Sequence, residues 1–371
     1  MNVKKAEKYI ILTMLSALLL LSIIAILYNV FFREEDKYAS PVYSKEKVTS
    51  NTVANNLIAI PKTIYSTEGE DMVIYSRNLL GNENDYEVKI DDLNNDVSSY
   101  QDYFVLHNNK SGIANLGVEL YSGKEIITSA KTKILTNPTR TTPIKGLVMG
   151  DSTIITNGHG YVTDRIIENL GSNINLVGTM GTEHNKYEGR GGWTAEKYRT
   201  NAIYSNKQNP FYNPSTEDFD FGYYMNNQGF SDLDFVIINL GINDVFAYNS
   251  DVELKNDSAH ILENFDKIIS SIKEYDENIR IGINLTIPPS DDQNMFAQEY
   301  EDKIKQARVK QNNFIWIQSL IEHYEESENV DLIPIHLGID TINNFENSVH
   351  PNIDGYNQIG DQITSYLNSL N

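Results

Sequence analysis

Two segments, far apart in the sequence, hold residue types that could transfer an acyl group. Ser152 lies in "VMGDSTI", directly after a short apolar run, where a serine hydroxyl could act as a nucleophile. His350 lies in "FENSVHPNIDGYNQIG", near the carboxyl end, where an imidazole could accept a proton and return it. Each residue alone is equally compatible with an ordinary turn, so the hypothesis depends on what accompanies the pair.

Two further segments contain groups that donate hydrogen bonds to negative charge. "YEGRGGWTAEKY" has three glycines in four positions, so the backbone N–H of Gly192 could approach a developing oxyanion. "IINLGINDVF" ends an apolar run at Gly241 and then places Asn243, whose side-chain amide is a neutral donor. A nucleophile, a base and two oxyanion donors are the parts that acyl transfer requires.

The elements around these segments predict one α/β sheet from about residue 144 onward. Apolar runs that read as buried strands alternate with amphipathic runs that read as helices. The predicted strands are "IKGLVMG", "NINLVGTM", "FVIINLG", "RIGINLTIPP" and "DLIPIHL". This alternation favours a parallel sheet with helices on both faces, and active residues collect at the carboxyl ends of its strands. All four candidate residues follow predicted strands.

In this order the four segments resemble the SGNH (GDSL-type) hydrolase family. The match is Ser152 in "GDS", Gly192 in "GGW", Asn243 in "GIND" and His350 in "VHP", and it extends to "HNKYEGRGGWTA" and "NPFYNPSTEDFDFGYYM". The resemblance covers the chain from Ile144 to the carboxyl end. It implies a three-layer α/β/α, flavodoxin-like parallel sheet.

The resemblance also implies a role for each residue. Ser152 would attack an ester carbonyl, with His350 as the base. The Ser152 N–H, the Gly192 N–H and the Asn243 amide would form the oxyanion hole. We further expect Asp151, Trp193 and Asp244 to contact the substrate.

Asn347 departs from the pattern of the family. Many members carry Asp three residues before the histidine, and an amide cannot compensate the charge of an imidazolium. Either His350 is oriented by Asn347 or a backbone carbonyl in a Ser–His dyad, or another carboxylate orients it, or the site only binds. The carboxylates near in sequence are those of Glu346, Asp354 and Asp340.

Residues 51–143 predict a second, all-β part. Short alternating runs rich in β-branched and aromatic residues are broken by Asn, Asp and Gly, as in "DMVIYSRNLL" and "YFVLHN". Six or seven strands in this length favour a small β-sandwich. Its role is either a glycan-binding module or a spacer.

The amino-terminal residues predict a membrane anchor. The uncharged run over residues 9–32 would reach roughly 36 Å as a helix, enough for a hydrocarbon core of about 30 Å. Lysines before the run favour a cytoplasmic tail over residues 1–8 and export of the chain beyond residue 32. A cleaved signal peptide is the alternative. Residues 33–50 read as a stalk, and residues 144–371 as the hydrolase domain at the cell exterior.

Composition excludes several classes of function. A net charge of −21 disfavours binding to nucleic acid. The chain has no Cys, and its seven His residues are scattered, so nothing predicts a metal site. The sequence has no phosphate-cradling GxxxxGK[ST] loop, and the predicted chemistry implies no cofactor.

Together these features predict an extracellular, membrane-anchored serine esterase that removes O-acetyl groups from carbohydrate. Aromatic residues near the four segments could stack on sugar faces; they are Tyr187, Trp193, Phe211, Tyr212, Tyr223 and Tyr224. The alternatives are an O-acetyltransferase that acts on glycans and a catalytically weak glycan-binding surface protein.

Overall fold

The computed structural model describes residues 57–81, 86–92, 96–301 and 303–370. All of them belong to one compact unit, Thr52–Asn371. The predicted cytoplasmic tail, transmembrane helix and stalk, residues 1–50, lie outside the described residues.

The predicted fold class included a transmembrane helix, and this part of the prediction is wrong. Among the residues that the structure describes, no helix is both long enough and apolar enough to cross a membrane. The longest of them, α6 (Asp251–Tyr275), buries only one face and carries charged side chains on the other. The cell-membrane location and the exterior placement stay predictions.

The first part of the unit consists of two β-sheets that share a core. One sheet has the order β1-β7-β6-β3 and the other β2-β5-β4. Their strands are β1 (Thr63–Thr67), β2 (Asp71–Tyr75), β3 (Glu87–Asp92), β4 (Val97–Ser99), β5 (Tyr103–His107), β6 (Gly112–Ser122) and β7 (Glu125–Asn137), with a 3₁₀ turn η1 (Ser76–Leu79) after β2. β1 runs parallel to β7, and the other pairs are antiparallel. Ile74 of β2 and Val118 of β6 are fully buried between the sheets.

The second part is built on a seven-stranded sheet of order β10-β11-β8-β16-β17-β18, with β9 beside the first half of β8. Its strands are β8 (Ile144–Gly150), β9 (Ile174–Val177), β10 (Met180–Gly181), β11 (Lys186–Gly189), β16 (Phe235–Asn239), β17 (Arg280–Asn284) and β18 (Val330–Ile333). Only the short β10–β11 pair is antiparallel. Every residue of β16 is buried, as expected of a strand that helices cover on both faces.

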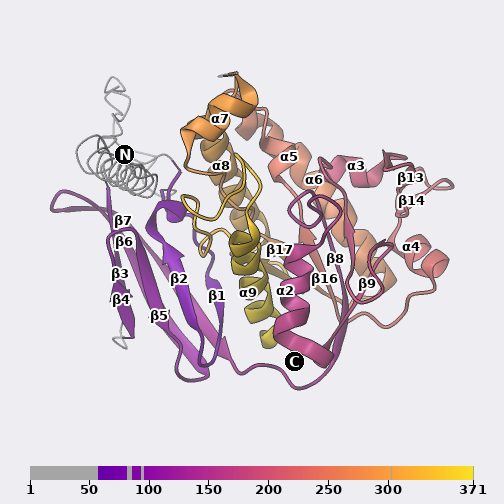
Figure 1. Ribbon diagram of the computed structural model, residues 1–371, viewed down its shortest axis with the longest axis horizontal. Helices are drawn as coiled ribbons and strands as arrows, with labels where there is room; N and C mark the ends of the chain where they lie inside the picture. Colours follow the sequence, from indigo (N-terminus) through magenta and orange to yellow (C-terminus); the bar gives the residue numbers. More distant parts are fainter. Residues whose placement is uncertain (1–56, 82–85, 93–95, 302, 371) are drawn as a thin grey trace, which may run out of the picture. The chain divides into compact units, whose positions relative to one another are not determined.

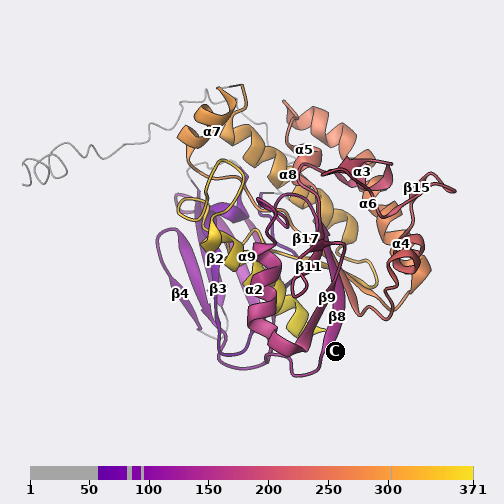
Figure 2. The same ribbon diagram turned by 45° about the vertical axis from the view of Figure 1, so that its right-hand side comes forward.

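Helices form a layer on each face of this sheet, so the α/β part has three layers. Figures 1 and 2 show the strands between α2 and α9 on one side and α6 on the other. The helices are α2 (Tyr161–Leu170), α3 (Ala195–Arg199), α4 (Phe221–Gln228), α5 (Ile242–Val245), α6, α7 (Gln293–Tyr300), α8 (Gln306–Tyr324) and α9 (Ile353–Ser369), with a 3₁₀ turn η2 (Gly171–Asn173) after α2. Two small hairpins follow α3: β12 (Ile203–Tyr204) with β13 (Lys207–Gln208), and β14 (Tyr212–Asn213) with β15 (Asp218–Phe219).

The β-sheet part holds the loop that follows β18. Leu337 of this loop is fully buried in the core between the two β-sheets. The Asn78 side-chain amide donates hydrogen bonds of 2.8 Å to the carbonyls of His336 and of Ile339. The Tyr75 N–H donates to the Leu337 carbonyl at 2.9 Å. This loop leads directly to His350, so the β-sheets support the segment that carries a candidate catalytic residue.

His336, in the same loop, makes the stability of the folded state depend on pH. Its Nε2 donates to the Ala59 carbonyl at 3.0 Å, and its buried Nδ1 has no hydrogen-bond partner among the described residues. Burial lowers the pKa of His336 to about 4. An unfolded histidine has a pKa near 6.5, so the unfolded chain binds more protons between these two values. The folded state therefore loses stability as the pH falls through this window.

We expect the His336→Gln variant to lose this part of the pH dependence. Between pH 7 and pH 4, the free energy of unfolding of the parent should fall by about 3 kcal/mol more than that of the variant. Urea denaturation at pH 7, 5.5 and 4 measures the difference. Equal pH dependence in the two proteins would contradict a neutral, buried His336.

Candidate active site

Ser152 lies in a tight turn at the carboxyl end of β8, the strand that pairs with β16. The Asp151 N–H donates to the Asn239 carbonyl at 3.2 Å, and the Asp151 carboxylate accepts the Thr153 N–H at 2.9 Å. At Gly150 an added Cβ would lie 2.5 Å from the Asn239 carbonyl oxygen, so only glycine allows this close approach. The turn leaves Ser152 partly exposed at the sheet edge where active residues gather.

His350 reaches this turn from the other end of the chain. Its Nε2 lies 2.9 Å from the Ser152 Oγ, although 198 positions separate the two residues. The Glu346 N–H donates to the His350 carbonyl at 2.9 Å, which folds the loop back on itself before α9. Asn352 then caps α9 by accepting the Gly355 N–H at 3.1 Å. The nucleophile and the base are thus in hydrogen-bond contact.

Asn347 orients the His350 imidazole through its side-chain carbonyl oxygen, which backbone N–H groups hold in place. The Asn347 Oδ1 accepts the Val349 N–H at 3.1 Å and the His350 N–H at 2.9 Å, and lies 3.1 Å from the His350 Nδ1. An oxygen that accepts two backbone N–H groups cannot be exchanged for the NH₂ group. Nδ1 must therefore carry the proton, which leaves the Nε2 lone pair free to accept the Ser152 proton.

The carboxylates considered from the sequence do not take this place. Asp340 accepts the backbone N–H groups of Ile342 and Asn343. Among the described residues, neither Glu346 nor Asp354 hydrogen-bonds the His350 ring. The geometry is that of a Ser–His pair oriented by Asn347.

Burial sets the protonation of His350. Removal from water lowers the pKa of His350, and the nearby charges of Glu299 and Glu346 oppose this effect without reversing it. Glu299 is held in turn by the Ser348 N–H at 3.3 Å and by the Ser348 hydroxyl. His350 is therefore neutral at pH 7 and able to act as a base.

The loop at Gly192 lies against the Ser152 turn. A Cβ added to Gly191 would lie 3.8 Å from the Ser152 Cβ, and Gly192 has a φ of +72°, which favours glycine. Within the described part of the chain, the N–H groups of Ser152 and Gly192 donate to no protein atom. Asn243, in α5, donates from Nδ2 to the Trp193 carbonyl at 3.1 Å, which fastens its amide to the same loop and leaves a second N–H. These donors are available for an oxyanion.

A buried ion pair, which sequence reasoning missed, supports this loop. Arg190 and Glu188 are 2% and 0% exposed, and their side chains meet at 2.5 Å. The Tyr224 hydroxyl donates to the Glu188 carboxylate at 2.9 Å, and the Tyr198 hydroxyl donates to the Gly150 carbonyl at 2.7 Å. In the sequence, the opposite charges of Glu188 and Arg190 beside the glycines of "EGRGG" could have indicated this ion pair.

Of the three residues predicted to contact substrate, Asp151 and Asp244 accept backbone N–H groups, and Trp193 packs in the core. Asp151 is fully buried, and burial raises its pKa to about 6. Trp193 is 4% exposed and packs edge-on against Tyr198. The Asp244 carboxylate accepts the Ala195 N–H at 3.1 Å, and burial raises its pKa to about 7.

Most of the aromatic residues considered for sugar stacking are core residues. Tyr187, Phe211 and Tyr224 are essentially inaccessible to solvent. Tyr212 and Tyr223 remain partly exposed. Among the described residues, no group of three or more His, Asp or Glu side chains could hold a metal ion.

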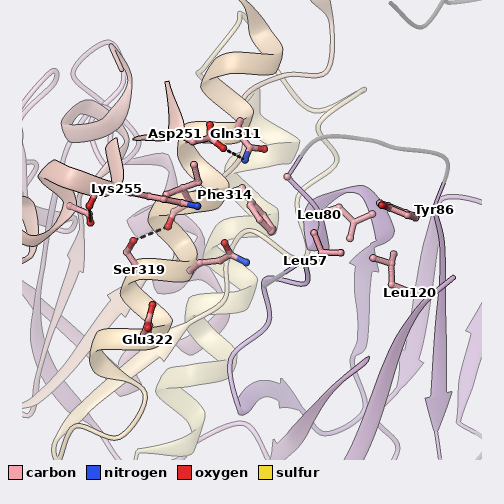
Figure 3. A pocket seen from close by; sticks show the side chains of 14 residues that line it. Leu57, Leu80, Tyr86, Leu120, Asp251, Lys255, Gln311, Phe314, Ser319 and Glu322 are labelled. Atoms are coloured by element: carbon pink, nitrogen blue, oxygen red, sulfur yellow. Dashed lines mark hydrogen bonds between the residues drawn. The ribbon is translucent and has the colours of Figure 1, made fainter. Parts of the chain in front are cut away.

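A cavity of about 460 Å³ lies away from the Ser152 turn. Figure 3 shows Leu80, Tyr86 and Leu120 of the β-sheet part facing Phe314 of α8 across it. Neither Ser152 nor His350 lines this cavity. It is separate from the candidate catalytic residues.

Comparison with known proteins gives one family match. The model of the GDSL-like lipase/acylhydrolase family matches residues 147–363, a range that contains Ser152, Gly192, Asn243 and His350. None of the curated proteins matches the chain significantly.

Several solved structures show a weak likeness. A carbohydrate esterase family 3 protein from Talaromyces cellulolyticus is 17% identical, with 60% of this chain and 96% of that chain covered, at a TM-score of 0.39. A family 3 carbohydrate esterase from Clostridium thermocellum is 18% identical, with 61% and 99% covered, at a TM-score of 0.38. A carbohydrate acetylesterase family member from Sinorhizobium meliloti is 13% identical, with 60% and 97% covered, at a TM-score of 0.39.

An Asn347→Asp variant should move the acid limb of the pH–kcat/KM profile to higher pH. A carboxylate beside Nδ1 favours the imidazolium and raises the pKa of His350 by about 1 unit or more. Hydrolysis of 4-nitrophenyl acetate between pH 4 and pH 9 measures the limb. Glu346→Gln is the control with the opposite sign, because loss of its charge should lower that pKa. An unmoved limb in Asn347→Asp would show that residue 347 does not face the ring.

An Asn243→Ala variant should lower kcat by roughly 10²–10³ with little change in KM, because an oxyanion donor acts mainly in the transition state. Steady-state kinetics with the same ester test this. Asn249→Ala, an exposed asparagine shortly after α5, is the matched control. A kcat within twofold of the parent would exclude Asn243 from the oxyanion hole.

Proposed function

We propose that this chain removes O-acetyl groups from carbohydrate. The chain belongs to the GDSL-like lipase/acylhydrolase family and is a carboxylic ester hydrolase of that type. The family match covers more than half of the chain. The observation that carries the proposal is the 2.9 Å contact between the Ser152 Oγ and the His350 Nε2.

The geometry supports an acyl-enzyme mechanism. His350 would take the Ser152 proton as the hydroxyl oxygen attacks the ester carbonyl. The resulting oxyanion would accept hydrogen bonds from the Ser152 N–H, the Gly192 N–H and the Asn243 amide. The imidazolium would return the proton to the leaving alcohol, and a water molecule activated by His350 would then release the acid.

The space beside Ser152 supports a small acyl group. A Cβ added to Gly191 would lie 3.3 Å from the Tyr204 hydroxyl and 3.8 Å from the Ser152 Cβ. The first distance is already tighter than an ordinary van der Waals contact, so the Tyr204 hydroxyl and the Gly191 backbone crowd this side of the Ser152 turn. A long acyl chain would have little space here, which supports a small acyl group such as acetyl.

The exposed side of the Gly192 loop is compatible with an ester of a bulky alcohol. Gly192 is exposed, and a Cβ added to it would meet no atom of the described residues within 4 Å. An alcohol on a polymer, such as a sugar hydroxyl, could therefore reach Ser152. The net charge of −21 favours neutral over anionic glycans.

Acetate release from acetylated xylan and from acetylated cello-oligosaccharides tests the proposal. The parent should release acetate, and Ser152→Ala should lower kcat by roughly 10⁶-fold, because the nucleophile acts in a unit with its base. Ser231→Ala, an exposed serine elsewhere, is the control and should retain activity.

Two results would contradict the proposal. Faster acetyl transfer to an added glycan than hydrolysis would identify an O-acetyltransferase. Glycan binding without turnover of any acetyl ester would identify a binding protein.

A further inference from the structure

A second hollow, of about 300 Å³, lies between the two small hairpins and α4. Figure 1 shows β13 and β14 between α3 and α4. Its lining includes five amide residues and two aromatic ones, which are Asn201, Gln208, Asn209, Asn227, Gln228, Tyr212 and Tyr223. None of the proposed catalytic residues takes part in it.

The chemistry of this lining suits an uncharged polyol. Among the residues that the structure describes, no charged one lines the hollow, although 22% of the chain is charged. Within the described residues, four of the five amide side chains hydrogen-bond no other protein group, and only that of Asn209 does. The Tyr212 and Tyr223 hydroxyls are likewise without a protein partner. Amides offer donors and acceptors to sugar hydroxyls at no charge, and tyrosine offers an apolar face with a polar tip.

Buried hydrogen bonds hold the walls in place. Asn209, itself 4% exposed, donates from its amide to the Tyr198 carbonyl at 2.6 Å and to the Thr200 carbonyl at 3.0 Å. Asn213 donates to the Asp220 carboxylate at 2.7 Å, and Asp220 caps α4 by accepting the Tyr223 N–H at 2.8 Å. A site whose backbone is already ordered loses less entropy when a ligand binds.

The hollow is distinct from the Ser152 turn. In the β12–β13 hairpin, Gln208 pairs with Ile203, whereas Tyr204 pairs with Lys207. Directly paired residues share one face of an antiparallel ladder, and neighbours along a strand face opposite sides. Gln208 thus lies on the face opposite to Tyr204, whose hydroxyl lies beside Gly191.

We propose that this hollow is a second binding site, for a neutral oligosaccharide. The ligand class follows from unpaired amides, partly exposed tyrosines and the lack of charge. A site here would retain a glycan polymer near the catalytic residues without taking part in the reaction. The inference goes beyond the proposed esterase activity and does not depend on it.

Titration calorimetry of the whole protein with cellohexaose, xylohexaose and chitohexaose tests the proposal. At least one of these neutral hexasaccharides should bind. Gln208→Ala and Asn227→Ala should each weaken that binding about tenfold, because each removes a hydrogen-bonding amide. Asn226→Ala is the matched control, since Asn226 is also exposed on α4 but does not line the hollow.

Hydrolysis of 4-nitrophenyl acetate is measured on the same variants and should be unchanged in all three. Absence of binding to all three hexasaccharides would overturn the proposal. So would equal binding by Asn227→Ala and the parent, or an equal loss in Asn226→Ala. If the parent hydrolyses no ester but binds a hexasaccharide through Asn227, the esterase proposal fails and the second site stands.

Discussion

The site depends on the orientation of one amide, that of Asn347. An asparagine can present either its oxygen or its NH₂ group to an imidazole, and the two choices have opposite consequences. If the NH₂ group faced Nδ1, the ring proton would sit on Nε2, and His350 could not accept the Ser152 proton. The N–H groups of Val349 and His350 both donate to the Asn347 oxygen and thereby hold that oxygen toward the ring. The tautomer that catalysis needs is therefore set by backbone geometry, without the negative charge that an aspartate would add.

The backbone at Asn347 is in turn held by the rest of the compact unit. The loop after β18 buries Leu337 between the two β-sheets, and Asn78 donates to two of its carbonyls. The same loop is tied down nearer to His350, where Ser348 contacts Glu299. On the opposite side of Ser152, the buried Glu188–Arg190 pair supports the glycine loop. A buried ion pair contributes little net stability but is costly to break, so it favours a single arrangement of that loop. The β-sheets thus hold the first part of the loop that carries His350.

The sequence predicted which segments the fold brings together better than it predicted the contacts that hold them. Ser152, Gly192, Asn243 and His350 each follow a buried strand, and a parallel sheet brings such positions to one edge whatever the loops do. The side-chain contacts within the loops could not be predicted in this way. Asp151, Trp193 and Asp244 look like exposed loop residues in the sequence, yet each is turned inward to satisfy a backbone group or to pack. Periodicity reports the buried face of a strand or helix, but irregular segments have no period, and their burial emerges only from the packed structure. The orientation of the Asn347 amide could not be predicted either, because it depends on the backbone path through Val349 and His350.

The ¹⁵N chemical shifts of the His350 ring, measured above its pKa, test the role of Asn347 most directly. The His350 signals are identified by their loss in the His350→Gln variant. The structure predicts a protonated Nδ1 and an unprotonated Nε2, because the Asn347 oxygen accepts from the first and the Ser152 hydroxyl donates to the second. A proton on Nε2 would contradict it, since the ring would then have no lone pair directed at Ser152.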